Sequence, residues 1–225
     1  GTILQSQYVL AGGNQTQDQK NTATTLDAVV GMLNTSSDGR YLFSGSTVDQ
    51  QPVDSVDHIL SGDGVKAGLT QVIAERKLAD LGANGLGRLN LGNPSSTSVS
   101  LTEDSISPFG FKLVGASTAM AGAAASPPSG SPQTMSIDFG SAAPVEGDTV
   151  KLTFTLPDGT TRDLTLTATN ASPPGDGQFT IGATPQDTAT NFQGALTQSL
   201  GKLANTELVA ASAVAAGNDF FNTDA

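Results

Sequence analysis

Two hydrophobic periodicities run along the chain, one in each half. In residues 16–34, TQDQKNTATTLDAVVGMLN, apolar side chains recur at the three- and four-residue spacing of one helical face. The residues of that face are Leu26, Val29, Val30 and Leu33. In residues 135–139 and 150–156, apolar and polar residues alternate, as they do in strands with one buried face. The pattern predicts a one-sided amphipathic helix near the start and a β-sheet in the second half.

The first predicted helix should end at residues 34–39, NTSSDG. Asn, Asp and Gly favour the left-handed and side-chain-bonded conformations that end helices and form turns. Residues 41–43, Tyr-Leu-Phe, have strong strand preference and are bounded by Gly45 and Pro52. We expect a short β-segment that folds back on the helix, with its two aromatic side chains capping the helix end.

A second helix is predicted within residues 62–82, GDGVKAGLTQVIAERKLADLG, and its apolar residues occupy two faces. One face holds Val65, Leu69, Val72 and Ile73, and the other holds Ala74, Leu78 and Leu81. A stripe that shifts in this way predicts a helix that either breaks or contacts neighbours on two sides. Glycine-rich turns follow at residues 82–92, and strands are predicted within residues 96–104 and 109–117.

The second half predicts a hairpin followed by a further strand. In LPDGTT, residues 156–161, Pro157 sets the first turn dihedral and Gly159 takes the positive φ of a bulged three-residue loop. Residues 163–169 should return as the second strand of this hairpin. Residues 178–182, QFTIG, are predicted to form another strand.

A covering helix is predicted to begin at Thr184, with Pro185 and Asp187 in its first turn. Its apolar face consists of Phe192, Leu196, Leu200 and Leu203. Residues 208–221, LVAASAVAAGNDFF, are rich in alanine, and their pattern leaves helix and strand open.

Composition divides the chain into two expected domains. Residues 119–131 are rich in Ala, Ser, Pro and Gly, which predicts a linker. The expected fold class is α+β. An amphipathic-helix stem with short β-segments should occupy residues 1–118, and an antiparallel β-sheet domain covered by a helix should occupy residues 132–225.

Charge and composition argue against several classes of partner. The 225 residues include 21 acidic and 10 basic ones, for a net charge of −11. Because nucleic acids and anionic membranes are bound mainly through Lys and Arg, we expect neither as a partner. No stretch approaches the roughly 20 apolar residues of a membrane-spanning helix. Hydrophobic residues make up only 37% and cysteine is absent, so we expect a thin core without disulfides or reactive thiolates.

Candidate catalytic residues are few. The one histidine, His58, stands near Asp54 and Asp57, but such spacing is common on ordinary surfaces and alone predicts no Ser-His-Asp site. Glu103 and Asp104 are adjacent carboxylates that should point to opposite sides of a strand. That placement argues against a shared acid–base site.

Two glycine-containing motifs resemble ligand-binding loops only in part. SGDGVK, residues 61–66, lacks the ladder of carboxylates and the closing Glu of a calcium loop, so it predicts a turn. GANGLGRLNLG, residues 82–92, has Asn90 where a dinucleotide-binding loop needs its third glycine, and no apolar strand precedes it. We therefore expect no catalytic residue, no cofactor and no metal ion.

Residues 24–53, TTLDAVVGMLNTSSDGRYLFSGSTVDQQPV, resemble a segment of the family of bacterial flagellins and flagellar hook-associated protein 3, the hook–filament junction protein. In that segment a long amphipathic helix ends and the first β-segment begins, and GRYLFSG is its most specific part. The family-like helix-to-strand turn comprises Asp38, Gly39, Arg40, Tyr41, Leu42, Phe43 and Gly45. The resemblance implies that Tyr41 and Phe43 fix the strand to the helical rod where the chain leaves it.

The resemblance implies a structural subunit of the bacterial flagellum, either a filament flagellin or the hook–filament junction protein, that assembles outside the cell and is not an enzyme. The implied partners are other flagellar subunits, in homo- or hetero-assembly. The β-sheet domain of residues 132–225 is similar to an inserted outer domain of some family members, and it would face solvent, where its Ser and Thr side chains could hold glycans. Flagellin-like chains also have long helical ends that pack as coiled coils, so we expect this sequence to be an interior fragment. The alternative is a cell-surface adhesin or polysaccharide-binding module that uses the sheet face of residues 132–182.

Overall fold

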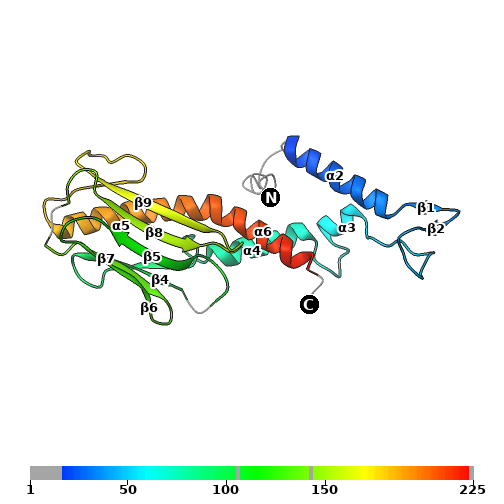
Figure 1. The fold of residues 1–225 in the computed structure, drawn as a ribbon, viewed down its shortest axis with the longest axis horizontal. Coiled ribbons are helices and arrows are strands. Elements are labelled where there is room, and N and C mark those ends of the chain that lie inside the picture. Colours follow the sequence, from blue (N-terminus) through cyan, green and yellow to red (C-terminus); the bar gives the residue numbers. More distant parts are fainter. Residues whose placement is uncertain (1–16, 105–106, 142–143, 223–225) are drawn as a thin grey trace. The chain divides into compact units, whose positions relative to one another are not determined.

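The computed structural model describes residues 17–104, 107–141 and 144–222, and Figure 1 traces their helices and strands. They form two compact units. In the described part of the chain, the helical unit comprises residues 17–76 and 213–222, and the sheet unit lies within Lys77–Ser212. The fold class is α+β, as predicted. The boundary between the units falls within α4 (Leu69–Leu81) and within α6 (Val209–Phe220), so each of these helices contributes residues to both.

The helical unit contains a small apolar cluster. Its other elements are α2 (Gln17–Leu33), β1 (Ser36–Ser37), β2 (Arg40–Tyr41) and α3 (Val56–Ser61). The buried cluster consists of Leu69, Ile73, Ala213 and Ala216. Leu60, Val72 and Phe220 pack against it and are partly buried. Two of the four buried members are alanines, so little apolar area is removed from water here.

The helix predicted within residues 62–82 is shorter than the apolar pattern suggested. It begins at Leu69, and Val65, which was expected on its face, lies before it and is exposed. Asp63 accepts hydrogen bonds from the backbone N–H groups of Val65 and Lys66, which holds this segment in a turn and delays the helix. The helix then runs without a break to Leu81.

The sheet unit contains two four-stranded sheets. Its strands are β3 (Leu89–Gly92), β4 (Ser98–Glu103), β5 (Lys112–Thr118), β6 (Ala124–Ser129), β7 (Thr134–Asp138), β8 (Thr149–Thr155), β9 (Thr161–Thr169) and β10 (Gln178–Thr180). One sheet has the order β10-β9-β8-β5 and the other has the order β3-β4-β7-β6. All pairs are antiparallel except β10 and β9, which run parallel.

One core lies between the two sheets and α5 (Pro185–Leu203), the long helix that Figure 1 shows running along the sheets. The predicted helix face is confirmed, because Phe192, Leu196, Leu200 and Leu203 are all buried. The rings of Phe139, Phe179 and Phe192 meet edge to face, with centroids 5.3–6.0 Å apart. The helix continues through a π-helical turn at Ala204–Leu208 into α6, so the segment that was open between helix and strand is helical.

A turn and a helix cap in the sheet unit form where the sequence predicted them. Gly159 has φ +80° in the hairpin between β8 and β9. The N–H of Leu156 donates to the carbonyl of Thr160, and the carbonyl of Leu156 accepts from the N–H of Gly159. Thr184 caps α5 by accepting a hydrogen bond from the N–H of Asp187, as expected. These two features align the hairpin and start the covering helix.

The division into domains differs from the one expected from composition. Residues 119–131, the predicted linker, contain β6, which pairs with β7. Strands from both sides of that segment share sheets: β4 pairs with β7, and β5 pairs with β8. The prolines at positions 127 and 128 gave this stretch a linker-like composition, but proline is tolerated in a strand at a sheet edge, where β6 lies.

Candidate functional site

Exposed apolar side chains gather in residues 29–43 of the helical unit. Large apolar residues of this stretch with more than a third of their surface exposed are Val29, Met32, Leu33, Leu42 and Phe43. They account for half of the large apolar residues that are exposed in the described part of the chain. We call these five residues the 29–43 apolar surface. Contiguous exposed apolar patches are typical of contact surfaces for other proteins, and this stretch is the candidate for one.

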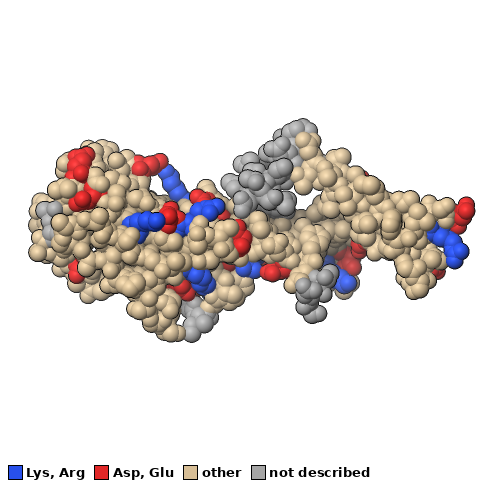
Figure 2. Space-filling view, viewed as in Figure 1, with Lys and Arg blue, Asp and Glu red and all other residues tan. Residues whose placement is uncertain are grey.

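The apolar helix face that the sequence predicted supplies part of this surface. Of its four residues only Val30 is buried, whereas Val29 and Leu33 are 44% and 38% exposed. Asp27 is the only charged residue from position 21 to position 37. Much of α2 accordingly appears uncharged on the face drawn in Figure 2. A helix does form at Gln17–Leu33, and within this chain most of the apolar stripe predicted on it stays in contact with solvent.

Asn34 holds the end of α2 to the chain that returns from the turn. Its side-chain N–H donates to the carbonyl of Val53 at 2.9 Å, and its side-chain oxygen accepts from the N–H of Val53 at 3.1 Å. This two-bond clamp joins residues 19 positions apart. Residues 35–52 therefore form a closed loop whose base is fixed at the helix end.

The predicted helix-to-strand turn is a tight hairpin. Asp38 and Gly39 have φ angles of +51° and +75°, and they connect the two-residue strands β1 and β2. Two consecutive positive φ angles match the type I′ turn that Asp-Gly sequences favour. Arg40 and Tyr41 form β2, and Tyr41 donates its backbone N–H to Val48 at 2.7 Å.

Leu42 and Phe43 lie outside the strand that the sequence predicted for them. Both side chains are exposed, at 60% and 62%. The expectation that Tyr41 and Phe43 cap the helix end is wrong for Phe43, while Tyr41 is half-buried. The strand ends at Tyr41 and Gly45 turns the chain with φ +62°, so the β-segment is too short to return Phe43 to the helix. Sequence patterns did not single out Met32, which lies beside the predicted stripe.

The histidine lies on the surface. His58 Nδ1 lies 3.0 Å from Asp54 Oδ1, and both side chains are more than half exposed. They line a shallow hollow of about 350 Å³ together with Asp63 and Phe220. Backbone hydrogen bonds from Lys66 and Val65 lower the pKa of Asp63 below its ordinary value, and they confirm the turn predicted for residues 61–66.

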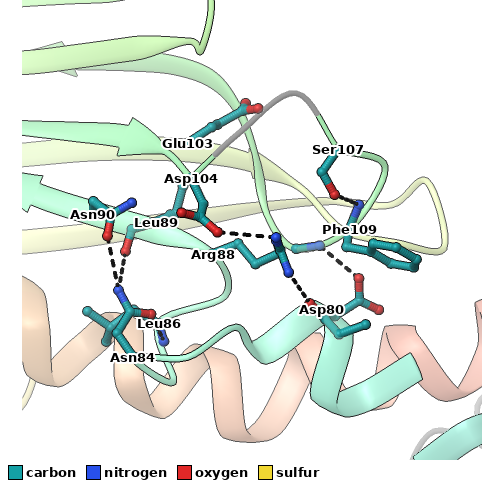
Figure 3. Close-up of polar contacts among 12 residues, drawn as sticks. Asp80, Asn84, Leu86, Arg88, Leu89, Asn90, Glu103, Asp104, Ser107 and Phe109 are labelled. Carbon is teal, nitrogen blue, oxygen red and sulfur yellow. Dashed lines mark hydrogen bonds and ion pairs between the residues drawn. The ribbon is translucent and has the colours of Figure 1, made fainter. Parts of the chain in front are cut away.

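A polar network surrounds the glycine-rich loop of residues 82–92 in the sheet unit (Figure 3). Arg88 donates to the carbonyl of Ala79 at 3.1 Å, and its other terminal nitrogen lies 3.1 Å from Asp104 Oδ2. The buried Asp80 accepts from the N–H of Gly110 at 2.7 Å. These bonds tie the end of α4 to the residue before β3 and to residues between β4 and β5. The network therefore stabilises the fold rather than forming an open site.

The adjacent carboxylates behave as the sequence predicted. Asp104 pairs with Arg88, whereas Glu103 is buried and accepts from the backbone N–H of Leu113 at 3.0 Å. The two side chains thus serve different partners. In the residues that the structure describes, no group of three or more His, Asp or Glu side chains has the arrangement of a metal site.

Comparison with known proteins gives no assignment. The chain matches no known family model, no curated protein and no solved structure. Within the described residues, no helix is both long enough and apolar enough to cross a membrane. The 29–43 apolar surface is therefore the feature of the described residues that points most directly to a function.

Proposed function

We propose that this chain is a structural subunit of the bacterial flagellum, either a filament flagellin or the hook–filament junction protein. It would assemble outside the cell through contacts with other flagellar subunits, of its own or a related type. The helical unit would provide such contacts, and the sheet unit would be the outer, solvent-facing part. The role proposed is motility through assembly, with no enzymatic activity.

The observation that supports this proposal most is the exposure of the 29–43 apolar surface. Met32 and Phe43, at 63% and 62% exposed, leave large apolar areas in water. Removing apolar surface from water is favourable by roughly 25 cal/mol per Å². A complex in which a partner covers these side chains would therefore be stabilised. The same stretch lies within residues 24–53, where the resemblance to flagellins and the junction protein is most specific.

A structural role also suits the chemistry of the described side chains. His58 pairs with Asp54 on the surface. Glu103 accepts from the backbone of Leu113 and from the Lys112 side chain, and Asp104 pairs with Arg88. These are the residues that the sequence offered for acid–base or nucleophilic chemistry. Each is accounted for by a structural contact.

The alternative, a polysaccharide-binding module that uses the sheet face of residues 132–182, is less well supported. Sugar-binding faces commonly use aromatic side chains as platforms. The aromatic residues of this segment are Phe139, Phe154 and Phe179, and all three are fully buried. They hold the core together and offer no platform on the sheet face.

Immunogold electron microscopy of the source cells tests the proposal. Antibody raised against the purified chain should place gold along whole filaments if the chain is a flagellin, or only where hook meets filament if it is the junction protein. Cells from which the gene has been deleted provide the control and should show no gold. Gold on the cell body with none on any appendage would contradict the flagellar proposal and favour a surface adhesin.

A further inference from the structure

A polar groove lies in the sheet unit between the loop of residues 174–178 and one face of α5. Its volume is about 310 Å³. That size falls at the lower end of the roughly 300–1,000 Å³ typical of small-molecule sites. Gly194 forms part of its wall on α5, and a Cβ atom added there would meet no heavy atom within 4 Å. The helix therefore leaves open space where another residue would place a side chain.

Uncharged hydrogen-bonding groups line both walls of this groove. On the helix wall, the side chains of Gln198 and Ser199 make no hydrogen bond with any described residue. On the loop wall, Gln178 uses only its side-chain oxygen, which accepts from the N–H of Gly175 at 3.0 Å. Asn191 donates its side-chain N–H to the carbonyl of Thr180 at 2.9 Å, which leaves its side-chain oxygen as an acceptor. The groove thus offers hydrogen-bond donors and acceptors that make no hydrogen bond within the described part of the chain.

The charge of the groove favours a neutral ligand. Asp176 and Lys202 are the only charged residues that line it, and their side chains pair at 2.6 Å. Because the two charges are opposite and close together, neither an anion nor a cation would gain much by entering. No aromatic or large aliphatic side chain lines the groove, so an apolar ligand would gain little as well.

We propose that this groove binds a neutral saccharide of one or two rings. Sugar hydroxyls both donate and accept hydrogen bonds, which matches the mixture of amides and hydroxyls on the two walls. Gln178 would bind from the loop wall, and Gln198 and Ser199 from the helix wall. Binding should be weak, in the millimolar range, because the groove is open and lacks an aromatic platform. Its loop wall belongs to the segment of residues 132–182, but the site also needs the helix wall of α5 and so differs from the sheet face discussed above. It goes beyond a purely structural role.

Nuclear magnetic resonance of the ¹⁵N-labelled chain tests this assignment. The probes are maltose, lactose, cellobiose and N,N′-diacetylchitobiose, each titrated through the millimolar range. At least one disaccharide should produce saturable shifts centred on the amide signals of Gln178, Gln198 and Ser199. Inorganic phosphate and acetate should produce none. If none of the four sugars gives saturable shifts there, or if phosphate does and they do not, the assignment is overturned.

The variant Gly194→Gln separates binding from folding. Its longer side chain would enter the groove, while glutamine favours a helix more than glycine does, so the fold should be kept. The matched control is Gly217→Gln in α6, where an added Cβ also meets nothing within 4 Å. Gly194→Gln should weaken sugar binding by roughly tenfold or more, and Gly217→Gln should leave it unchanged. Equal sugar shifts in the two variants would place the binding elsewhere and overturn the proposal.

Discussion

The two units of the chain bury their apolar residues to very different extents. In the sheet unit five phenylalanines are fully buried: Phe111, Phe139, Phe154, Phe179 and Phe192. In the helical unit the buried cluster holds only two large side chains, Leu69 and Ile73, beside two alanines. Met32 and Phe43 of the same unit remain largely in water. The sheet unit completes its core with its own residues, whereas the helical unit leaves large apolar side chains exposed to solvent.

The largest expected effect comes from truncating the centre of the sheet-unit core. Phe192→Ala removes a fully buried ring that contacts Phe139 and Phe179, and such changes cost about 3–5 kcal/mol of stability. Ile73→Ala, the corresponding change in the helical unit, should cost about 2 kcal/mol because its surroundings are smaller. Urea unfolding followed by far-ultraviolet circular dichroism measures both. A greater loss for Ile73→Ala would contradict the comparison.

A second, smaller effect is expected at the glycine-rich loop. Gly87 has φ +67°, and a Cβ atom there would lie 2.2 Å from the ring of Phe111 and 2.9 Å from Leu208. Gly87→Ala should therefore cost roughly 3 kcal/mol, from overpacking together with backbone strain. Gly85→Ala is the matched control, because Gly85 has φ +69° with nothing within 4 Å. If the two variants unfold at the same urea concentration, the close packing around Gly87 does not contribute to the free energy of unfolding.

A smaller effect, dependent on pH, is expected on the surface of the sheet unit. Hydrogen bonds from Lys151 and then Thr153 lower the pKa of Asp163 below its ordinary value of 3.8. A lowered pKa in the folded state means that the contribution is present above the unfolded pKa and is lost as the pH falls through the folded one. Asp163→Asn should therefore slightly lower the urea midpoint at neutral pH.

At a pH below the lowered folded-state pKa the same variant should unfold together with the unmodified chain, since the carboxyl group is then protonated in both states. Lys151→Met serves as the partner variant, and it should remove most of the effect of Asp163→Asn when the two are combined. A midpoint difference that stays constant from neutral to acidic pH would rule out this ion pair as its source.

The smallest stability effect is expected at the 29–43 apolar surface itself. Met32→Ser and Phe43→Ser each change an exposed side chain, so the free chain should lose no more than about 0.5 kcal/mol. The same urea titration applies, with Phe192→Ala as the contrast. A loss above about 1 kcal/mol would mean that these side chains support the fold and are not reserved for a partner.

Local patterns in the sequence were sufficient for most individual elements. Alternation in residues 150–156 gave β8, and Pro157 with Gly159 gave the hairpin that follows. The cap at Thr184 marked the start of α5. Each of these features depends on residues only a few positions apart, where backbone and side-chain preferences act directly.

Pairing between distant segments could not be predicted in this way. β5 pairs with β8 across the stretch that contains β6 and β7, and nothing in the pattern of either strand specifies its partner. β6 was not predicted because its two prolines make its composition typical of a linker. Its position at a sheet edge, where proline is tolerated, is known only from the fold. The exposure of the apolar residues on α2 could not be predicted either. Their spacing indicates an apolar face but does not indicate whether other residues cover it.

The saccharide groove illustrates the same limit. Its two walls come from residues 174–178 and from a helix face that begins at Thr190. Neither stretch contains a recognisable binding motif. The groove arises from the missing side chain at Gly194 and from the packing of the loop against α5, which only the folded chain reveals.

The central claim is that the 29–43 apolar surface becomes covered when subunits assemble. The chain has no cysteine, so Met32→Cys introduces a single thiol on this surface, and Val145→Cys introduces one at an exposed position in the sheet unit. Maleimide should label both variants readily in the purified chain. In intact flagella isolated from the source cells, the account predicts that Met32→Cys is protected while Val145→Cys stays reactive. Equal labelling of the two variants in flagella would contradict it.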